Sequence, residues 1–349
     1  MQIEPNNFRT LIVLLNWNGA KLTLDCCDSL SKLSTKAYDI LVIDNHSETL
    51  DFDELEVGLQ KHAQQLNEFS TNSSQEHLLN EYQIDRVYSY TIKQDLHIML
   101  ASSLTNHGFA RGCNFGVLFA NQFSYSHVLL LNNDTIVEKD FLEKLFLHKK
   151  NYNIVIPQIR FFEPSNKIWN CGGEINNFGK RKYFFANKDV TAVNLPKEPF
   201  SISFATGCCM LIETSFYIES GMFTEDFFFG EEDIDYALRL NSLKAKVACV
   251  PESIIYHKVG ASLAGDLVKL RRKAYIHFLN RFINMKNHLG LLWFLWIIPA
   301  TLKMALNLNK IYELSIYQTF SFCSKIISAS LQKNKVEKEY FEKIMKVGY

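Results

Sequence analysis

The sequence lacks the cysteine spacing of a zinc or disulfide framework. Its eight cysteines contain no C-x-x-C pair, and the adjacent pairs Cys26–Cys27 and Cys208–Cys209 cannot easily form ordinary bridges. The opening residues MQIEPNNFRT are polar and include an acidic side chain, so they do not resemble a signal peptide. We therefore expect reduced thiols and a cytoplasmic protein.

The chain has no net charge, because 37 basic residues balance 37 acidic ones, but the two signs are separated along it. Eight acidic residues and one lysine occupy residues 48–81, whereas nine basic residues and one aspartate occupy residues 258–310. The basic segment predicts an anionic partner; the alternative is a solvated basic face.

A hydrophobic run long enough to span a bilayer is also missing. The most apolar stretch, residues 289–302, is shorter than the roughly 20 residues that a spanning helix needs, and it contains Pro299. A transmembrane helix is one interpretation of it. The basic residues that precede it favour a helix at a membrane interface, and a buried helix is the third possibility.

Buried strands alternate with helical patterns in the first half of the chain, which predicts an α/β fold with a parallel sheet. The apolar runs 8–15 and 38–43 read as strands, and residues 21–33 between them have helical spacing. Residues 48–95 fit no clear pattern and are taken as a partly helical insertion. The remaining predicted strands are 96–100, 127–131, 154–156, 204–212 and 247–250, and the remaining helices are 115–121, 140–149, 233–241 and most of the chain beyond 266.

Polar residues cluster where the predicted strands end, at Asn16, Asp44 and Asn132-Asn133-Asp134. Open α/β sheets bind ligands at that edge, so a nucleotide-binding sheet is plausible. Asp134 follows a buried strand and could hold a hard cation together with diphosphate oxygens. A plain turn is the alternative, because Asn-Asn-Asp is also turn chemistry.

An acidic cluster opens the helix predicted at residues 233–241. Glu231, Glu232, Asp233 and Asp235 would be stabilised by the helix dipole, so capping is one reading. Four carboxylates beside three phenylalanines exceed what capping needs. One of them could act as a general base toward a hydroxyl group.

Two further segments carry polar chemistry. His257 could bind a Mn²⁺-like metal if it shared a site with Asp134, although a lone histidine is more often structural. In the segment NHGFARGCNFG (106–116), three glycines permit close backbone approach, and Asn106 and Asn114 could bond a ribose, a sugar or the backbone. No G-x-G-x-x-G follows the first strand, which argues against a dinucleotide oxidoreductase.

Taken together, these segments resemble the family 2 inverting glycosyltransferases, in particular the bacterial rhamnosyltransferase-like branch. The matching pieces occur in the family's order over residues 10–290. They are VLLNWNG (13–19), IDNHS (43–47), NHGFARGCNFG (106–116), LLLNNDT (129–135), ATGCCMLI (205–212), FFFGEEDIDYALRL (227–240) and YHKVGAS (256–262). The metal motif departs from D-x-D, since only Asp134 is a carboxylate.

The resemblance implies a GT-A catalytic domain over residues 1–265, with an insertion at about 48–95, followed by a helical region at 266–349. It implies Asp233 as general base, with Glu232 as its closest rival, and Asp134 and His257 as ligands of Mn²⁺ or Mg²⁺. Arg239 would brace the acidic motif. The residues implied in donor binding are Asn16, Asp44, Asn106, Gly108, Asn114, Asn133, Thr206 and Gly207.

The implied partners are a nucleotide-sugar donor, such as a dTDP- or UDP-sugar, and a saccharide or polyprenyl-linked acceptor. No nucleic acid is expected, and a homo-oligomer is left open. The rival functions are a sugar nucleotidyltransferase and a non-catalytic carbohydrate-binding protein on the same fold.

The helical region is expected to dock on the inner face of the cell membrane without crossing it. In this hypothesis Trp293 and Trp296 sit at the water–lipid boundary. The alternative is that the apolar helix packs on the catalytic domain or forms a dimer contact. The residues expected to meet anionic headgroups are Lys269, Arg271, Arg272, Lys273, Arg281 and Lys286.

Overall fold

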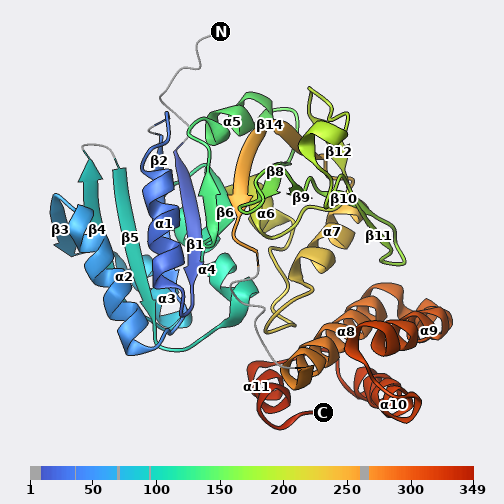
Figure 1. Ribbon diagram of the computed structural model, residues 1–349. Helices are drawn as coiled ribbons and strands as arrows, with labels where there is room; N and C mark the ends of the chain where they lie inside the picture. Colours follow the sequence, from blue (N-terminus) through green and yellow to red (C-terminus); the bar gives the residue numbers. More distant parts are fainter. Residues whose placement is uncertain (1–8, 36, 69–70, 94–95, 260–266) are drawn as a thin grey trace.

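The computed structural model describes residues 9–35, 37–68, 71–93, 96–259 and 267–349. A large twisted sheet lies between helices, and a group of helices from the end of the chain packs below one side of it (Figure 1). The strands follow the order β12-β14-β8-β13-β6-β1-β2-β5-β4-β3, with β7 paired to β14 and β9 paired to β8. The α/β fold expected from the sequence is therefore confirmed.

Four neighbouring parallel strands form the centre of the sheet: β6 (His127–Asn132), β1 (Thr10–Asn16), β2 (Tyr38–Asp44) and β5 (Leu96–Ser103). Their leucine, isoleucine and valine side chains are buried on both faces, which is why the runs are continuously apolar rather than alternating. Helix α1 (Ala20–Leu30) connects β1 to β2 as expected.

The segment predicted to be an insertion is part of the sheet. Helix α2 (Thr49–His62), strand β3 (Gln65–Glu68), helix α3 (Ser73–Glu81) and strand β4 (Ile84–Lys93) occupy it. Strand β4 runs antiparallel to β5, and β3 antiparallel to β4, so the segment extends one edge of the sheet. Strand β4 (IDRVYSYTIK) mixes charged and polar residues with apolar ones and lacks the continuous apolar run of the central strands. For this reason the sequence analysis did not recognise it as a strand.

The other half of the sheet is mixed. Strand β13 (Cys209–Glu213) runs antiparallel between β6 and β8 (Ile154–Phe161), and β14 (Val247–His257) runs parallel to β8. The prediction of a strand over 204–212 was wrong for residues 204–208, which form a loop and an isolated bridge. The strand predicted at 247–250 continues through a bulge to His257, because the register shifts between Val250 and Ile254.

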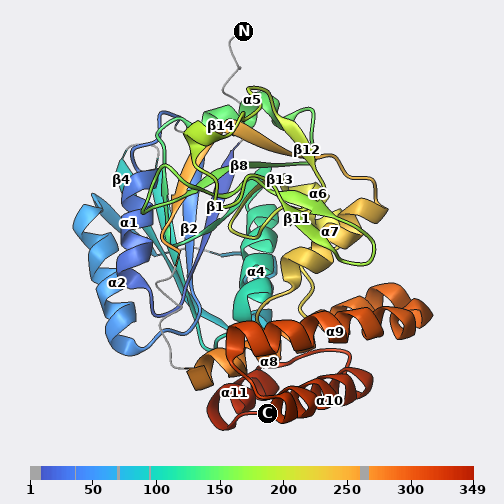
Figure 2. The same cartoon turned by 45° about the vertical axis from the view of Figure 1, so that its right-hand side comes forward.

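The remaining elements up to Ser242 complete this half. They are β7 (Thr135–Val137), α5 (Phe141–Lys149), β9 (Ile168–Asn170), β10 (Gly173–Ile175), β11 (Arg181–Tyr183), η1 (Val190–Ala192), β12 (Phe200–Ile202), α6 (Thr214–Glu219) and α7 (Glu232–Ser242). Strands β10 and β11 form a separate antiparallel hairpin that projects beyond α7 (Figures 1 and 2).

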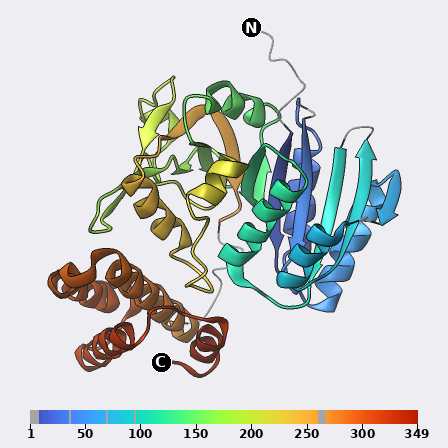
Figure 3. The same cartoon turned by 180° about the vertical axis from the view of Figure 1, so that it is seen from behind.

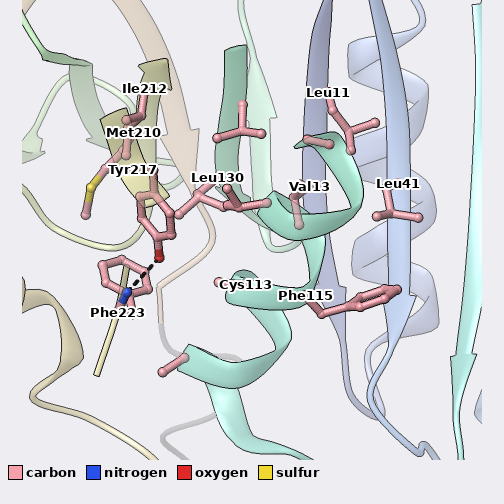
Figure 4. Packing of buried hydrophobic residues seen from close by; sticks show 14 of the residues in the cluster. Leu11, Val13, Leu41, Cys113, Phe115, Leu130, Met210, Ile212, Tyr217 and Phe223 are labelled. Carbon is pink, nitrogen blue, oxygen red and sulfur yellow. Dashed lines mark hydrogen bonds between the residues drawn. The ribbon is translucent and has the colours of Figure 1, made fainter. Parts of the chain in front are cut away.

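The glycine-rich segment is the first half of helix α4 (Gly108–Gln122), not a turn before a helix as predicted. A Cβ added at Gly112 would lie 2.5 Å from Leu15 Cδ1, and one at Gly116 would lie 2.4 Å from Val13 Cγ1. These two glycines therefore let α4 approach strand β1 closely. The close backbone approach that the sequence predicted for this segment is thus an approach of a helix to the sheet. Figure 4 shows this helix, with Cys113 and Phe115, lying over Val13.

Four C-terminal helices make a separate apolar cluster with α7. They are α8 (Leu267–Leu289), α9 (Trp293–Tyr312, preceded by the short η2, Gly290–Leu292), α10 (Ile316–Gln332) and α11 (Lys338–Val347). Buried residues of these helices pack with Ile234 and Leu238 of α7 and with Phe227. Figure 3 shows this group of helices from behind, beside the region that contains the large sheet. The predicted boundary at 265/266 falls outside the described residues.

Three basic residues of α8, namely Arg271, Arg272 and Lys286, donate hydrogen bonds to backbone carbonyls at the ends of the neighbouring helices. The expectation that these three side chains meet lipid headgroups is therefore wrong. Arg271 donates to the carbonyls of Tyr312 and Glu313 at the end of α9. Arg272 does the same for Met345 and Lys346 in α11, and Lys286 for Ser330 and Lys333 at the end of α10. Free carbonyls and the negative end of the helix dipole favour cations at these positions.

The two tryptophans assigned to the lipid boundary also face inward. Trp293 is buried, and its indole nitrogen donates to the carbonyl of Phe282, 3.0 Å away. Trp296 is half-buried and donates to the carbonyl of Phe178 at 2.9 Å. Trp293 thus packs α9 against α8, and Trp296 joins α9 to the β10–β11 hairpin.

The close approach of α4 to β1 yields a stability prediction. Alanine is a better helix former than glycine by about 1 kcal/mol, yet we expect Gly116→Ala to lower the free energy of unfolding by about 1–3 kcal/mol, because the new methyl group overlaps buried Val13. Urea unfolding measures this. The exposed control Asn121→Ala should not destabilise the fold, and Val13→Ala with Gly116→Ala should cost less than the two single changes added. A stabilised Gly116→Ala protein would contradict the packing argument.

Candidate functional site

The first part of the site lies at the carboxyl ends of β1 and β2, where Asn16 and Asp44 are register partners. The amide of Asn16 donates to Asp44 Oδ1 at 2.8 Å and to Asp51 at 3.2 Å, and its oxygen accepts from Thr23. Ser47 donates to Asp44 Oδ1 at 2.6 Å. Since Asn16 is fully buried, it positions Asp44 rather than reaching a ligand itself.

Three of these partners were not singled out in the sequence. Ser47 belongs to the I-D-N-H-S segment and could have been found there, but Asp51 lies in α2 and Thr23 in α1. Asn133 donates to Thr23 Oγ1 at 2.8 Å, so Thr23 connects Asn16 with the loop that carries Asp134. A network of polar side chains therefore joins the ends of β2, β1 and β6.

Asn106 and Gly108 secure the start of helix α4 against the end of β2. Asn45 donates to Asn106 Oδ1 at 3.0 Å and to the carbonyl of Gly108 at 3.1 Å. Gly108 has a φ of +78°, and a Cβ there would lie 2.1 Å from the carbonyl oxygen of Phe228. Only glycine fits this position, which brings the loop before α7 against the first turn of α4.

Asn114 lies apart from this network, and the structure does not support its predicted contact with the donor. Its amide donates to the carbonyl of Phe223 at 2.9 Å and to Glu225, while its oxygen accepts from Tyr217 and from the Phe223 backbone. Figure 4 shows the neighbouring hydrogen bond between Tyr217 and Phe223. The residue is buried and holds the loop after α6 onto α4.

Asp134 and His257 come together because β7 pairs with β14, with Thr135 opposite His257. Asp134 Oδ1 and His257 Nε2 lie 3.0 Å apart. Asp134 Oδ1 and His257 Nδ1 are both buried, and neither has a well-aligned hydrogen-bond partner among the described residues. Trp169 packs edge-on against the imidazole, with ring centroids 4.5 Å apart.

These two side chains fit a divalent cation that takes nitrogen and oxygen ligands. A buried carboxylate oxygen without a hydrogen-bond donor is costly unless a ligand satisfies it. No group of three or more such ligand side chains occurs within the described ranges, so diphosphate oxygens would have to complete the shell. Burial lowers the pKa of His257, but the neighbouring side chains of Cys208 and Asp134 outweigh it and raise that pKa to about 10. A bound cation would have to displace this proton, because only the neutral imidazole is a metal ligand.

The acidic motif forms the other half of the site. Helix α7 begins at Glu232, after Glu231 adopts a left-handed conformation with a φ of +75°. Burial and, after it, the charge of a neighbouring carboxylate together raise the pKa of Asp233 to about 6 and that of Glu232 to about 8. Glu232 therefore keeps its proton to higher pH, and Asp233 is the carboxylate that ionises first.

Thr206, Gly207 and Cys208 bridge the two halves. The backbone nitrogen of Gly207 lies 3.5 Å from Asp233 Oδ2, while Cys208 is next to His257 and its carbonyl accepts from the backbone of Asn132. The family resemblance implied that Thr206 and Gly207 take part in donor binding. The structure brings them, Asp233 and the Asp134–His257 pair to one region of the molecule.

The remaining acidic residues of the motif have structural partners. Asp235 accepts from Arg239 at 2.8 Å and pairs with His288 of α8 at 2.8 Å, so Arg239 braces the motif as expected. Glu231, only 4% exposed, contacts Arg281 and Asn284 of α8 at 3.2 Å each. Asn280 donates to the carbonyl of Phe229 just before it.

These α8 partners were missed in the sequence, where Arg281 was assigned to the membrane. A buried carboxylate costs free energy unless it is paired, and Arg281 supplies the opposite charge from a distant part of the chain. No short-range pattern links residues 231 and 281, so only the folded chain reveals that the helical region holds the acidic loop.

No protein-family profile matches the chain. Two known proteins are similar to it over part of its length. The low-salt glycan biosynthesis hexosyltransferase Agl10 of Haloferax volcanii is 24% identical over 196 residues, covering 54% of this chain and 60% of its own length. The dTDP-rhamnosyl transferase RfbF of Shigella flexneri is 21% identical over 243 residues, covering 65% of this chain and 80% of its own. The chain thus spans less than two thirds of the first relative.

Two solved structures share the fold. The mannosyltransferase PcManGT from Pyrobaculum calidifontis, in complex with GDP-Man and Mn²⁺, superposes with a TM-score of 0.50 at 13% identity over 95% of this chain and 88% of its own. GalNAc-T7 with UDP, GalNAc and Mn²⁺ also gives 0.50 at 13% identity, over 88% of this chain and 59% of its own. The resemblance to glycosyltransferases is thereby confirmed, and the chain has the GT-A fold.

Proposed function

We propose that this protein is a metal-dependent, inverting glycosyltransferase of the family 2 type that acts in cell-surface glycan synthesis. The observation that carries the proposal is the placement of Asp233 beside Thr206–Gly207–Cys208, with the Asp134–His257 pair on the other side of that segment. A base and a cation site on either side of one short segment suit a reaction between an acceptor hydroxyl and a diphosphate-activated sugar.

The donor would bind along the polar network at the strand ends. Asp44, fixed by Asn16 and Ser47, would bond the base or ribose. Asn133 and the loop at Asn106–Gly108 would border the donor. We take a dTDP- or UDP-sugar as the donor class, since one relative is a dTDP-rhamnosyl transferase and GalNAc-T7 is described with UDP.

The chemical step is a single displacement. The ionised carboxylate of Asp233 accepts the proton of the acceptor hydroxyl while its oxygen forms the new bond to the anomeric carbon. The bond from that carbon to the diphosphate oxygen breaks, and the nucleoside diphosphate leaves with the electron pair. Attack and departure on opposite faces invert the anomeric centre. Bound at Asp134 and His257, Mn²⁺ or Mg²⁺ would neutralise charge on the leaving diphosphate.

The first prediction concerns the base. Asp233→Asn should lower kcat by about 10²–10⁴-fold and leave donor affinity nearly unchanged, as measured by calorimetry. Glu232→Gln is the matched control and should retain far more activity. Because Asp233 must be ionised and its pKa is raised to about 6, kcat should fall as the pH drops below about 6. An active Asp233→Asn protein with an inactive Glu232→Gln protein would move the role to Glu232.

The second prediction concerns the cation. EDTA should stop transfer, and added Mn²⁺ or Mg²⁺ should restore it. Asp134→Asn should weaken Mn²⁺ binding about tenfold or more, because this carboxylate is the one charged ligand that the described residues offer there. Titration of Mn²⁺ in the presence of nucleoside diphosphate measures this. Full activity after thorough chelation would eliminate the metal from the proposal.

The proposed location is the cytoplasmic face of an anionic membrane, docked through α9 and α10. Together, η2 and one side of α9 expose Leu291, Leu295, Ile298, Leu302 and Leu306, each between 63% and 85% exposed. Such a contiguous apolar surface marks an interaction site. The start of α10 adds three more exposed side chains, namely Ile316, Tyr317 and Phe320.

Charge favours a membrane as the partner of this surface. Glu313 is the one acidic residue in the sequence from 267 to 332, and Lys303 and Lys310, seven residues apart and both exposed, border the apolar side of α9. The stretch Leu267–Tyr312 is long and apolar enough to cross a membrane by length and composition, and 11% of its most apolar part is buried. A surface dock needs only the exposed side of α9.

The third prediction tests the dock by vesicle flotation. Leu295→Ser, Ile298→Ser and Leu302→Ser together should abolish binding, since each loses about 1.5–3 kcal/mol of burial, whereas Leu50→Ser and Leu104→Ser, which alter exposed leucines elsewhere, should not. Binding should require anionic lipid, weaken with salt and be reversed by carbonate. Resistance to carbonate would mean a spanning helix. Absence of flotation, with a dimer that the triple change dissociates, would mean a subunit interface.

A further inference from the structure

A basic hairpin lies between the acidic motif and the apolar side of α9. Strands β10 and β11 are joined by a turn, and Lys180, Arg181 and Lys182 follow one another on its returning arm. Among the described residues, none of the three forms an ion pair, although Glu174 stands opposite Lys182 in the register. Side chains alternate along a strand, so Arg181 and Lys182 point to opposite faces of the hairpin. The guanidinium of Arg181 lies 5.9 Å from the ring centroid of Tyr183, and the ammonium of Lys182 lies 5.8 Å from that of Phe184. Within the described part of the chain, Arg181 is therefore the cation without a carboxylate partner on the face that carries Tyr183.

The hairpin is tied to the acidic motif by a single side chain. The guanidinium of Arg281 donates to the carbonyl of Gly179 in the hairpin turn and to Glu231 Oε2 at 3.2 Å. On the other arm, the backbone of Ile175 donates to Ser203 Oγ at 2.9 Å. Tyr183 packs edge-on against Phe204, two residues before Thr206, with ring centroids 5.6 Å apart. The hairpin therefore flanks both the loop of Asp233 and the Thr206–Gly207 segment.

The electrostatic effects of Arg181 on its neighbours agree with this position of the hairpin beside Asp233. Its charge lowers the pKa of Asp233 against the larger effects of burial and Glu231, and it also acts on buried His277 and on Tyr183. Arg181 is half-buried, whereas Lys180 and Lys182 are exposed. The guanidinium thus lies on the side of the hairpin that faces the base.

The same hairpin touches the apolar helix. Trp296 of α9 donates from its indole nitrogen to the carbonyl of Phe178 in the hairpin turn, 2.9 Å away. Leu295 and Ile298, on either side of Trp296 in the sequence, belong to the exposed apolar side of α9, and Phe178 itself is 55% exposed. Figure 2 shows the hairpin above α9 and beside α7.

We propose that Arg181 forms the subsite for the diphosphate of a lipid-linked acceptor, an inference that rests on the proposed transferase function. The molecule offers, in order, an apolar surface on α9, the guanidinium of Arg181 on the hairpin and the carboxylate of Asp233. A lipid-linked saccharide carries, in the same order, an apolar chain, one or two phosphates and a sugar hydroxyl. Arginine suits the phosphate position because its planar guanidinium binds phosphate oxygens in pairs.

Binding of farnesyl diphosphate and farnesol to the full chain tests the subsite. Calorimetry in EDTA, in one detergent for both probes, leaves out any cation-dependent binding of a diphosphate at Asp134 and His257. We expect farnesyl diphosphate to bind at least tenfold more tightly than farnesol. Arg181→Gln should weaken the diphosphate about tenfold without changing farnesol, Arg181→Lys should retain part of the difference, and Lys188→Gln, an exposed lysine outside the hairpin, should change neither.

Two results would overturn the subsite. Equal affinity of the unaltered protein for both probes would show that phosphate is not recognised, and an equal loss for both probes in Arg181→Gln would show that the residue only supports the fold. Vesicle flotation separates bulk headgroups from the acceptor. Arg181→Gln should float like the unaltered protein, and lost flotation with unchanged farnesyl diphosphate binding would assign the hairpin to headgroups.

The failure of the subsite and the failure of the proposed function can be told apart. The binding experiment contains no donor and no cation, so it does not depend on transfer. Diphosphate binding through Arg181 in a protein that transfers no sugar would refute the transferase alone. Transfer to a neutral alkyl saccharide, without any preference for the diphosphate probe, would refute the subsite alone.

Discussion

The parallel pairing of β1 with β2 and with β6 is the constraint on which the rest of the site depends. In this register Asn16 lies opposite Asp44, and Leu15 lies opposite Asn132. Because parallel strands end at the same edge, the polar residues after each apolar run meet there and nowhere else. Their apolar side chains are buried on both faces, so a register shift would place polar termini in the core.

A second constraint is the buried carboxylate of Glu231. Its left-handed backbone and its Oε2 contacts with Arg281 and Asn284 fix the loop that precedes Asp233. The helical region is therefore more than an appendage, since α8 supplies the charge that permits an acidic loop inside the protein. A surface on α9 that binds a membrane would lie within the same helical group as the residues that hold the loop before Asp233.

The charge pattern of α8 shows how one composition can serve several purposes. The basic residues read as a membrane footprint are largely divided between helix ends and the acidic loop: Arg271, Arg272 and Lys286 bind terminal carbonyls, and Arg281 binds Glu231. Free carbonyls at a helix end attract cations as anionic lipids do, so a run of positive charge cannot distinguish the two. The apolar side of α9, rather than those cations, is what remains for a partner.

Sequence by itself determined the buried strands, because short apolar runs that are rich in β-branched residues and bounded by polar ones favour strands buried on both faces of a sheet. It also predicted, through spacing and family resemblance, that the segments with Asp134, Asp233 and His257 carry the chemistry. Tertiary structure alone decided that β4 and β3 extend the sheet, that Gly112 and Gly116 serve helix packing, and that Asn114 holds a loop. It alone decided the pairing of Glu231 with Arg281. These facts depend on contacts between residues far apart in the chain, and no local pattern of hydrophobicity or charge encodes such contacts.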